Sequence, residues 1–178
     1  MVILGIDPGT NTTGFGIITW ERNKVNWVAS GTIELPEKET LARKLELIYD
    51  HVVDLAHTYK PNECAIENVF YSKNVKSALK LGHARAAAML GALHKAVHIS
   101  EYSPKDMKMA VVGNGNASKE QVQYMVKMVL GITKEMSFDE SDALGLAICR
   151  AQRIKAPRAS VSSWKAYIKA HPDRVKVK

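Results

Sequence analysis

Ile3-Leu4-Gly5-Ile6-Asp7-Pro8-Gly9-Thr10 is the stretch of this 178-residue chain that indicates the fold most directly. The apolar run before Asp7 is typical of a buried strand, and the residues from Asp7 to Thr10 are typical of the turn that ends one. A lone carboxylate is costly to bury there. A glycine beside it allows the backbone to approach a substrate closely. The stretch therefore predicts a strand with a functional acid at its carboxyl end.

The segments that follow predict the rest of the sheet. Further strands are expected at 14–20, 25–35, 63–70 and 97–102, and apolar spacing of helical period predicts helices at 40–59 and 74–96. Ser103, Ser118 and Ser137 have the pattern of helix N-caps, and Ser118 and Ser137 each begin a capping box. Three consecutive strands followed by alternating helices and strands predict an α/β fold, a mixed five-stranded sheet flanked by helices.

Composition indicates one ordinary domain. With 46% hydrophobic and 24% charged residues the chain is typical of a globular protein, and no apolar run approaches membrane-spanning length. We expect a single domain at 1–156 and a basic tail at 157–178, because apolar residues are sparse after Pro157. Cys64 and Cys149 suggest buried small side chains rather than a disulfide framework, which favours the cytoplasm.

The positive charge of the chain lies in two blocks. Residues 73–119 carry 8 basic and 2 acidic groups, a net +6, and residues 150–178 carry 9 basic and 1 acidic group, a net +8. Such blocks suit a polyanion such as DNA. Solvated surface lysines are the alternative that charge alone leaves open.

Three more acids belong with Asp7. Glu67 lies in the apolar segment Cys64-Ala65-Ile66-Glu67-Asn68-Val69-Phe70, and Asp139 and Asp142 are three residues apart, hence on one face of a predicted helix. Carboxylates gathered in one place repel each other, and divalent cations offset that repulsion. The alternative for Asp139 is that it complements the helix dipole, but Glu67 in a strand has no such role. We therefore predict one catalytic, metal-binding site of four acids.

Five motifs, taken in order, resemble the RuvC family of Holliday junction resolvases. They are Gly5-Ile6-Asp7-Pro8-Gly9-Thr10, Ala65-Ile66-Glu67-Asn68-Val69-Phe70, Ser77-Ala78-Leu79-Lys80-Leu81-Gly82-His83-Ala84-Arg85, Val111-Val112-Gly113-Asn114-Gly115 and Asp139-x-x-Asp142-Ala143-Leu144. The resemblance covers residues 1–153. It implies an RNase H-like fold, a homodimer and symmetric nicking of four-way DNA junctions. It also implies that the four acids bind two Mg²⁺ ions per active site, with Mn²⁺ as a substitute. A branch-migration motor as partner is implied by the resemblance alone.

Aromatic and basic residues around these acids are the candidates for DNA contact. Phe70 and Tyr71 follow the Glu67 strand directly, and the family resemblance implies that Phe70 unstacks bases near the cut. The alternative is that Phe70 points into the core. The basic candidates are Lys73, Lys76, Lys80, Arg85, Lys105, Lys108 and Lys119. Lys105, Lys108 and Lys119 lie near predicted helix starts, where amides and lysines bind phosphate.

Two other functions compete with a nuclease. Asp7-x-Gly9-Thr10 also resembles the first phosphate motif of actin-like sugar kinases and ATPases, but those need a second lobe, for which 178 residues leave little room. A noncatalytic junction-binding protein is the second alternative. Metal-dependent cleavage of a junction separates all three functions.

Overall fold

The computed structural model of the chain describes residues 1–68 and 75–155. In chain order the elements are β1 (Val2–Asp7), β2 (Thr12–Glu21), β3 (Lys24–Glu34), α1 (Leu41–Tyr59), β4 (Glu63–Glu67), α2 (Val75–His94), β5 (His98–Tyr102), α3 (Pro104–Val112), α4 (Lys119–Leu130) and α5 (Phe138–Lys155). These elements confirm the predicted sequence of strands and helices, with shifts of a few residues at their ends.

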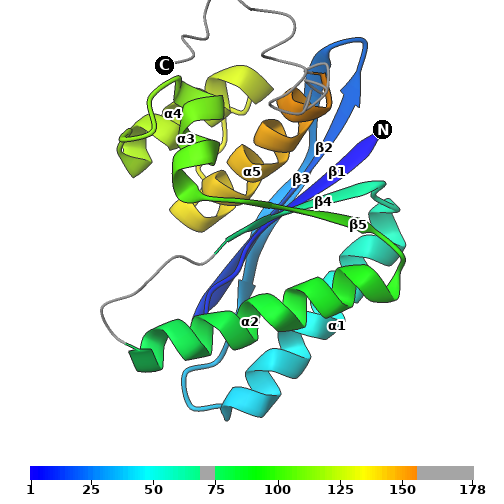
Figure 1. Cartoon of the computed structure of the whole chain (residues 1–178), viewed down its shortest axis with the longest axis vertical. Coiled ribbons are helices and arrows are strands. Elements are labelled where there is room, and N and C mark those ends of the chain that lie inside the picture. Colours follow the sequence, from blue (N-terminus) through cyan, green and yellow to red (C-terminus); the bar gives the residue numbers. More distant parts are fainter. Residues whose placement is uncertain (69–74, 156–178) are drawn as a thin grey trace, which may run out of the picture.

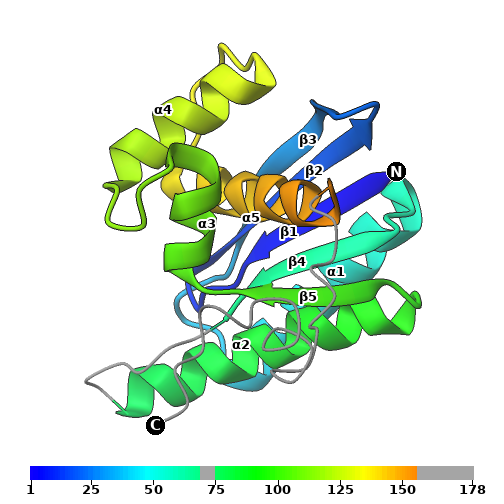
Figure 2. The ribbon, with the colours of Figure 1, turned by 45° about the horizontal axis from the view of Figure 1, so that its top comes forward.

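The five strands form one mixed sheet in the order β3-β2-β1-β4-β5 (Figure 2). β1 pairs antiparallel with β2 and parallel with β4, which places the first strand at the centre. Helices α1 and α2 cover one face, and α5 crosses the other with α3 and α4 packed against it (Figure 1). The predicted α/β, RNase H-like fold is therefore confirmed.

Strand alternation divides the core between the two faces. Ile3, Ala65 and Ile18 belong to the cluster that packs under α5, whereas Leu4 and Ile66 belong to the cluster under α1 and α2. Gly5 and Asp7 have the parity of Ile3, and Glu67 has the parity of Ala65. Both acids therefore lie on the α5 face of the sheet.

The helix ends follow the sequence signals. Ser103 and Ser118 begin α3 and α4 with complete capping boxes, and Gly113 and Gly131 end them in the left-handed conformation. At α5 the capping prediction holds in part. The Ser137 hydroxyl accepts the Glu140 N–H at 3.1 Å, but the Glu140 carboxylate accepts from Lys134 Nζ at 2.8 Å.

Both cysteines are buried and free, as predicted. Within residues 1–68 and 75–155, no helix is both long and apolar enough to cross a membrane. The predicted tail at 157–178 lies outside the described residues, so the proposed domain boundary stays a prediction.

Candidate active site

Asp7 and Glu67 lie side by side at the carboxyl ends of two neighbouring parallel strands. Ile6 of β1 is in register with Ile66 of β4, so the next residue on each strand is one of the two acids. Both side chains are only partly buried, and both face α5. Parallel pairing thus joins two acids that are 60 positions apart in the sequence.

Helix α5 adds Asp139 and Asp142 from its first turns. Its backbone rests directly on glycines of the sheet, since a Cβ atom at Gly5 would lie 1.9 Å from the Ala143 carbonyl oxygen. A Cβ atom at Gly14 would lie 2.0 Å from the Asp139 carbonyl oxygen. Any side chain at either position would push α5 away from the sheet, so these glycines set how closely its acids approach Asp7.

The four carboxylates influence one another electrostatically. Burial, followed by the charges of Glu67, Asp142 and Asp139, raises the pKa of Asp7 from 3.8 to about 8. Burial and the charge of Asp142 raise the pKa of Glu67 from 4.5 to about 7. The pKa of Asp142, which is 6% exposed, is also raised, mainly by burial. A cluster of this kind favours protons or cations.

Two lysines supply positive charge to the cluster. Lys119 Nζ, at the first residue of α4, lies 3.5 Å from Asp142 Oδ2 and 5.8 Å from the centre of the Phe138 ring. Burial opposes the charging of Lys119, yet Asp142, Asp7 and Asp139 together raise its pKa. The charge of Lys108, on α3, lowers the pKa of Glu67 and of Asp142.

The carboxylates lie near one another but are too far apart for any three of them to share a metal ion in the described conformation. Within the described part of the chain, no three His, Cys, Asp or Glu side chains form a group already tight enough to hold a metal ion. Burial and neighbouring carboxylates raise the pKa of Asp7 and of Glu67, so the charged forms of these two groups are disfavoured at this spacing. The donor set nevertheless fits a hard divalent cation, since carboxylate oxygens are its preferred ligands.

An open cavity of about 320 Å³ adjoins the acids. Its lining combines the turn after β1 with two residues of α2 and one acid of α5, namely Asp7, Pro8, Gly9, Thr10, Asn11, Thr12, Ser77, Leu81 and Asp139. Substrate can therefore reach Asp7 and Asp139 from this side.

The remaining predicted DNA contacts lie at varied places. Lys76 and Lys80 are exposed on α2, and Lys105 is exposed on α3. Arg85 donates to the Glu67 carbonyl oxygen at 3.0 Å and pairs with Glu101, so its guanidinium already has partners within the protein. Three further predictions, Phe70, Tyr71 and Lys73, lie outside the described residues.

Sequence reasoning missed several residues that build this site. Gly5 and Gly14 were not recognised as the floor beneath α5, although a glycine inside a strand signals close backbone approach. Thr12 was also missed, and its hydroxyl donates to Asp139 Oδ2 at 2.5 Å. No local sequence pattern predicts that contact, because it joins residues 127 positions apart.

Comparison with known proteins agrees with this geometry. The model of the family described as crossover junction endodeoxyribonuclease RuvC matches residues 3–150. The protein of that name from Francisella philomiragia is 49% identical over 156 residues, covering 88% of this chain and 91% of its own. The one from Salinibacter ruber is 40% identical over 178 residues, covering 98% and 99%. The solved structure of Thermus thermophilus RuvC in complex with Holliday junction substrate is 28% identical, with a TM-score of 0.81 over 87% of this chain and 95% of that one.

Proposed function

Because the chain belongs to the RuvC family of crossover junction endodeoxyribonucleases, we propose that it resolves four-way DNA junctions by paired, symmetric phosphodiester cleavage. The observation that carries this function is the convergence of Asp7, Glu67, Asp139 and Asp142 on one face of the sheet, where the charges of the other three acids raise the pKa of Asp7. Two acids at strand ends and two on a helix, with Lys119 paired to Asp142, suit phosphate chemistry better than structural support.

We assign the four acids as the ligands of divalent metal, with Mg²⁺ as the proposed ion and Mn²⁺ as a substitute. Two such ions, when bound, lower the pKa of an attacking water and stabilise the charge on the leaving oxygen. The protein's own part is to orient the ligands. The register of β1 and β4 holds Asp7 and Glu67 together, and the glycine floor sets the height of α5.

Lys119 and Lys108 complete the proposed mechanism. Lys119 offsets the negative charge of the acids in the free protein. When a phosphodiester approaches, the same ammonium group stands within reach of a phosphate oxygen, and Lys108 adds charge from α3. We therefore assign both lysines to binding of the scissile phosphate, rather than to the role of ordinary solvated surface lysines.

We propose that the active protein is a homodimer joined through α2. The outer face of this helix exposes large apolar side chains at helical spacing, with Val75 70%, Leu79 61%, Leu90 59% and Leu93 53% exposed. Exposure of such an apolar stripe to water is unfavourable, and patches of this kind often mark protein interfaces. An isologous pair also matches the approximate two-fold symmetry of a four-way junction, which places one active site on each of two opposed strands.

Location in the cytoplasm is part of the same proposal. Burial raises the pKa of the free Cys64 thiol to about 12 and that of Cys149 to about 11. Such thiols are unreactive and serve as small apolar core groups, which is compatible with a reducing compartment.

The test is cleavage of a synthetic mobile four-way junction in Mg²⁺, with linear duplex as the substrate control. We expect paired nicks in the junction only, and we expect Asp7→Asn to lose at least about a hundredfold in cleavage rate while it still binds the junction, because the variant keeps its basic surfaces. An Asp7→Asn protein that cuts near the wild-type rate would refute the assignment of the site. ATP turnover would favour the kinase alternative, and tight binding without cutting by the wild type would favour a noncatalytic protein.

A further inference from the structure

The first two residues of β2 contact two different parts of the acidic site. Thr12 is partly buried on the α5 face of the sheet, and its Oγ1 donates to Asp139 Oδ2 at 2.5 Å. This is a hydrogen bond to a carboxylate, the stronger kind. It occupies one oxygen of Asp139 and restricts how the carboxylate can rotate about its last bond.

Thr13 points to the other side of the strand and is fully buried. Its hydroxyl accepts the Gly9 N–H at 3.2 Å and donates to the Gly9 carbonyl oxygen at 3.1 Å. One side chain thus holds both backbone groups of the residue that lies two positions after Asp7. The turn also requires glycine at position 9, because a Cβ atom there would lie 2.0 Å from the Thr12 carbonyl oxygen.

We propose that Thr12 and Thr13 are positioning residues for the metal-binding acids, Thr12 for Asp139 on α5 and Thr13 for the turn that follows Asp7. This inference rests on the proposed role of those acids. Neighbours in a strand point to opposite faces, so two consecutive threonines reach two separate elements from one rigid strand. The sheet itself thereby sets the distance between Asp7 and Asp139, whose mutual repulsion would otherwise drive them apart.

Each hydroxyl has a chemical role that shape alone does not supply. Valine has nearly the shape of threonine but no hydroxyl, whereas serine keeps the hydroxyl and loses the methyl group. A hydrogen-bonding role therefore predicts that serine retains function and valine does not. A packing role predicts the reverse order.

The experiment measures Mn²⁺ binding to the full-length protein without DNA, by the electron paramagnetic resonance signal of free Mn²⁺. We expect Thr12→Val to weaken Mn²⁺ binding about tenfold, in line with the loss of a group that supports a metal ligand. Thr12→Ser should stay within about threefold of wild type. Thr58→Val, at an exposed position of α1 on the far side of the sheet, should leave Mn²⁺ binding unchanged.

Thr13→Val and Thr13→Ser separate positioning from folding in the buried case. We expect Thr13→Val to lower the Tm and also to weaken Mn²⁺ binding of the folded protein about tenfold or more, with Thr13→Ser restoring most of both. Unchanged Mn²⁺ binding in Thr12→Val, equal losses in its valine and serine variants, or a Thr13→Val protein that loses Tm alone would overturn the proposal. A wild-type protein that binds no Mn²⁺ or cuts no junction would instead show that the proposed function had failed.

Discussion

At the scale of single residues, the fold disfavours the charged forms of three acids of the site, Asp7, Glu67 and Asp142. The charged form of Asp7 is strongly disfavoured, because burial and three neighbouring carboxylates raise its pKa to about 8. The unfolded chain releases that proton near pH 4, so between about pH 4 and pH 8 the folded state binds more protons than the unfolded state. Without divalent metal, stability should therefore fall as pH rises through this range.

Asp7→Asn should remove much of this decrease of stability with rising pH, because asparagine has no proton to release in this range. In the presence of EDTA we expect its Tm to match the wild type near pH 4 and to exceed it by several degrees at pH 8, since about 1 kcal/mol corresponds to about 2–4 °C for a chain of this size. Added Mg²⁺ should raise the Tm of the wild type more than that of the variant.

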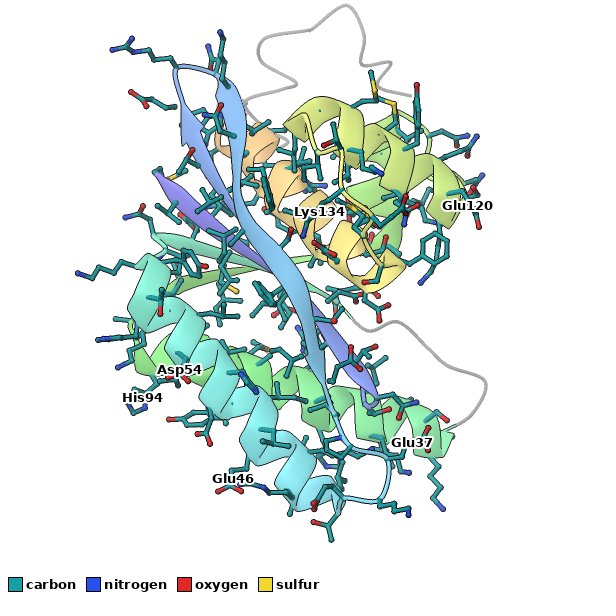
Figure 3. All side chains as sticks on the ribbon, turned by 180° about the vertical axis from the view of Figure 1, so that it is seen from behind. Glu37, Glu46, Asp54, His94, Glu120 and Lys134 are labelled. Atoms are coloured by element: carbon teal, nitrogen blue, oxygen red, sulfur yellow. The ribbon has the colours of Figure 1, made fainter. Side chains whose placement is uncertain are left out.

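Differential scanning calorimetry across this pH range makes the comparison, with Asp54→Asn as the control. Asp54 is an acid on the exposed surface of α1, remote from the site (Figure 3). The control should follow the wild-type curve. A Tm difference for Asp7→Asn that is constant with pH would contradict the raised pKa of Asp7.

At the scale of elements, the distance between α5 and the sheet determines where the proposed metal ligands of α5 lie. At Gly5 and Gly14 the backbone of α5 contacts the backbone of the sheet directly. No flexible side chain lies between them that could adjust the distance from the helix to the sheet. Lys134 lies between α5 and the β2–β3 hairpin (Figure 3), where its ammonium group pairs with Glu140 and stands 5.2 Å from the centre of the Trp27 ring. These contacts fix the first turn of α5, which carries Asp139.

Gly5→Ala should lift α5 and separate the acids. The added methyl group would meet the Ala143 carbonyl oxygen, and overpacking of this kind costs about 1–3 kcal/mol. We expect a lower Tm and, at a temperature where the variant is still folded, a loss of Mg²⁺-dependent cleavage larger than the loss of junction binding.

Gly82→Ala on α2 is the matched control, because a Cβ atom there meets nothing within 4 Å inside the protomer. Alanine is the better helix former, so this variant should be as stable as the wild type or more stable. If Gly5→Ala proved as stable and as active as wild type, the glycine floor would have no role in placing the acids.

At the scale of the whole molecule, the protein presents an apolar face on α2 and a basic tail in the sequence. Leu79→Glu should break the proposed dimer, because it would bury an unpaired charge within the apolar stripe. Light scattering at micromolar concentration should show monomer for this variant. Met128→Glu, at an equally exposed apolar position on α4, should remain dimeric. A wild-type protein that is monomeric with and without junction DNA would contradict paired nicking by a dimer.

Deletion of residues 157–178 tests the tail. This segment carries 6 basic residues and 1 acidic residue, so it is suited to nonspecific phosphate contact. We expect weaker junction binding and a shallower dependence of affinity on salt, by roughly 0.9 in the logarithmic slope for each phosphate that the tail neutralises. An unchanged slope, measured by fluorescence anisotropy between low and moderate salt, would exclude the tail from DNA binding.

The sequence by itself was enough to predict the order of strands and helices, the caps at Ser103 and Ser118, and which four acids would lie together, while their role as metal ligands stays a prediction. Those features arise from local causes, namely apolar periodicity, capping chemistry and charge inside apolar segments. Only the tertiary structure decided that Thr12 holds Asp139, that Arg85 pairs with Glu101, and that glycines carry α5. These contacts join segments far apart in the chain, and the free energy that selects them comes from packing the whole sheet between two layers of helices, which no local pattern contains.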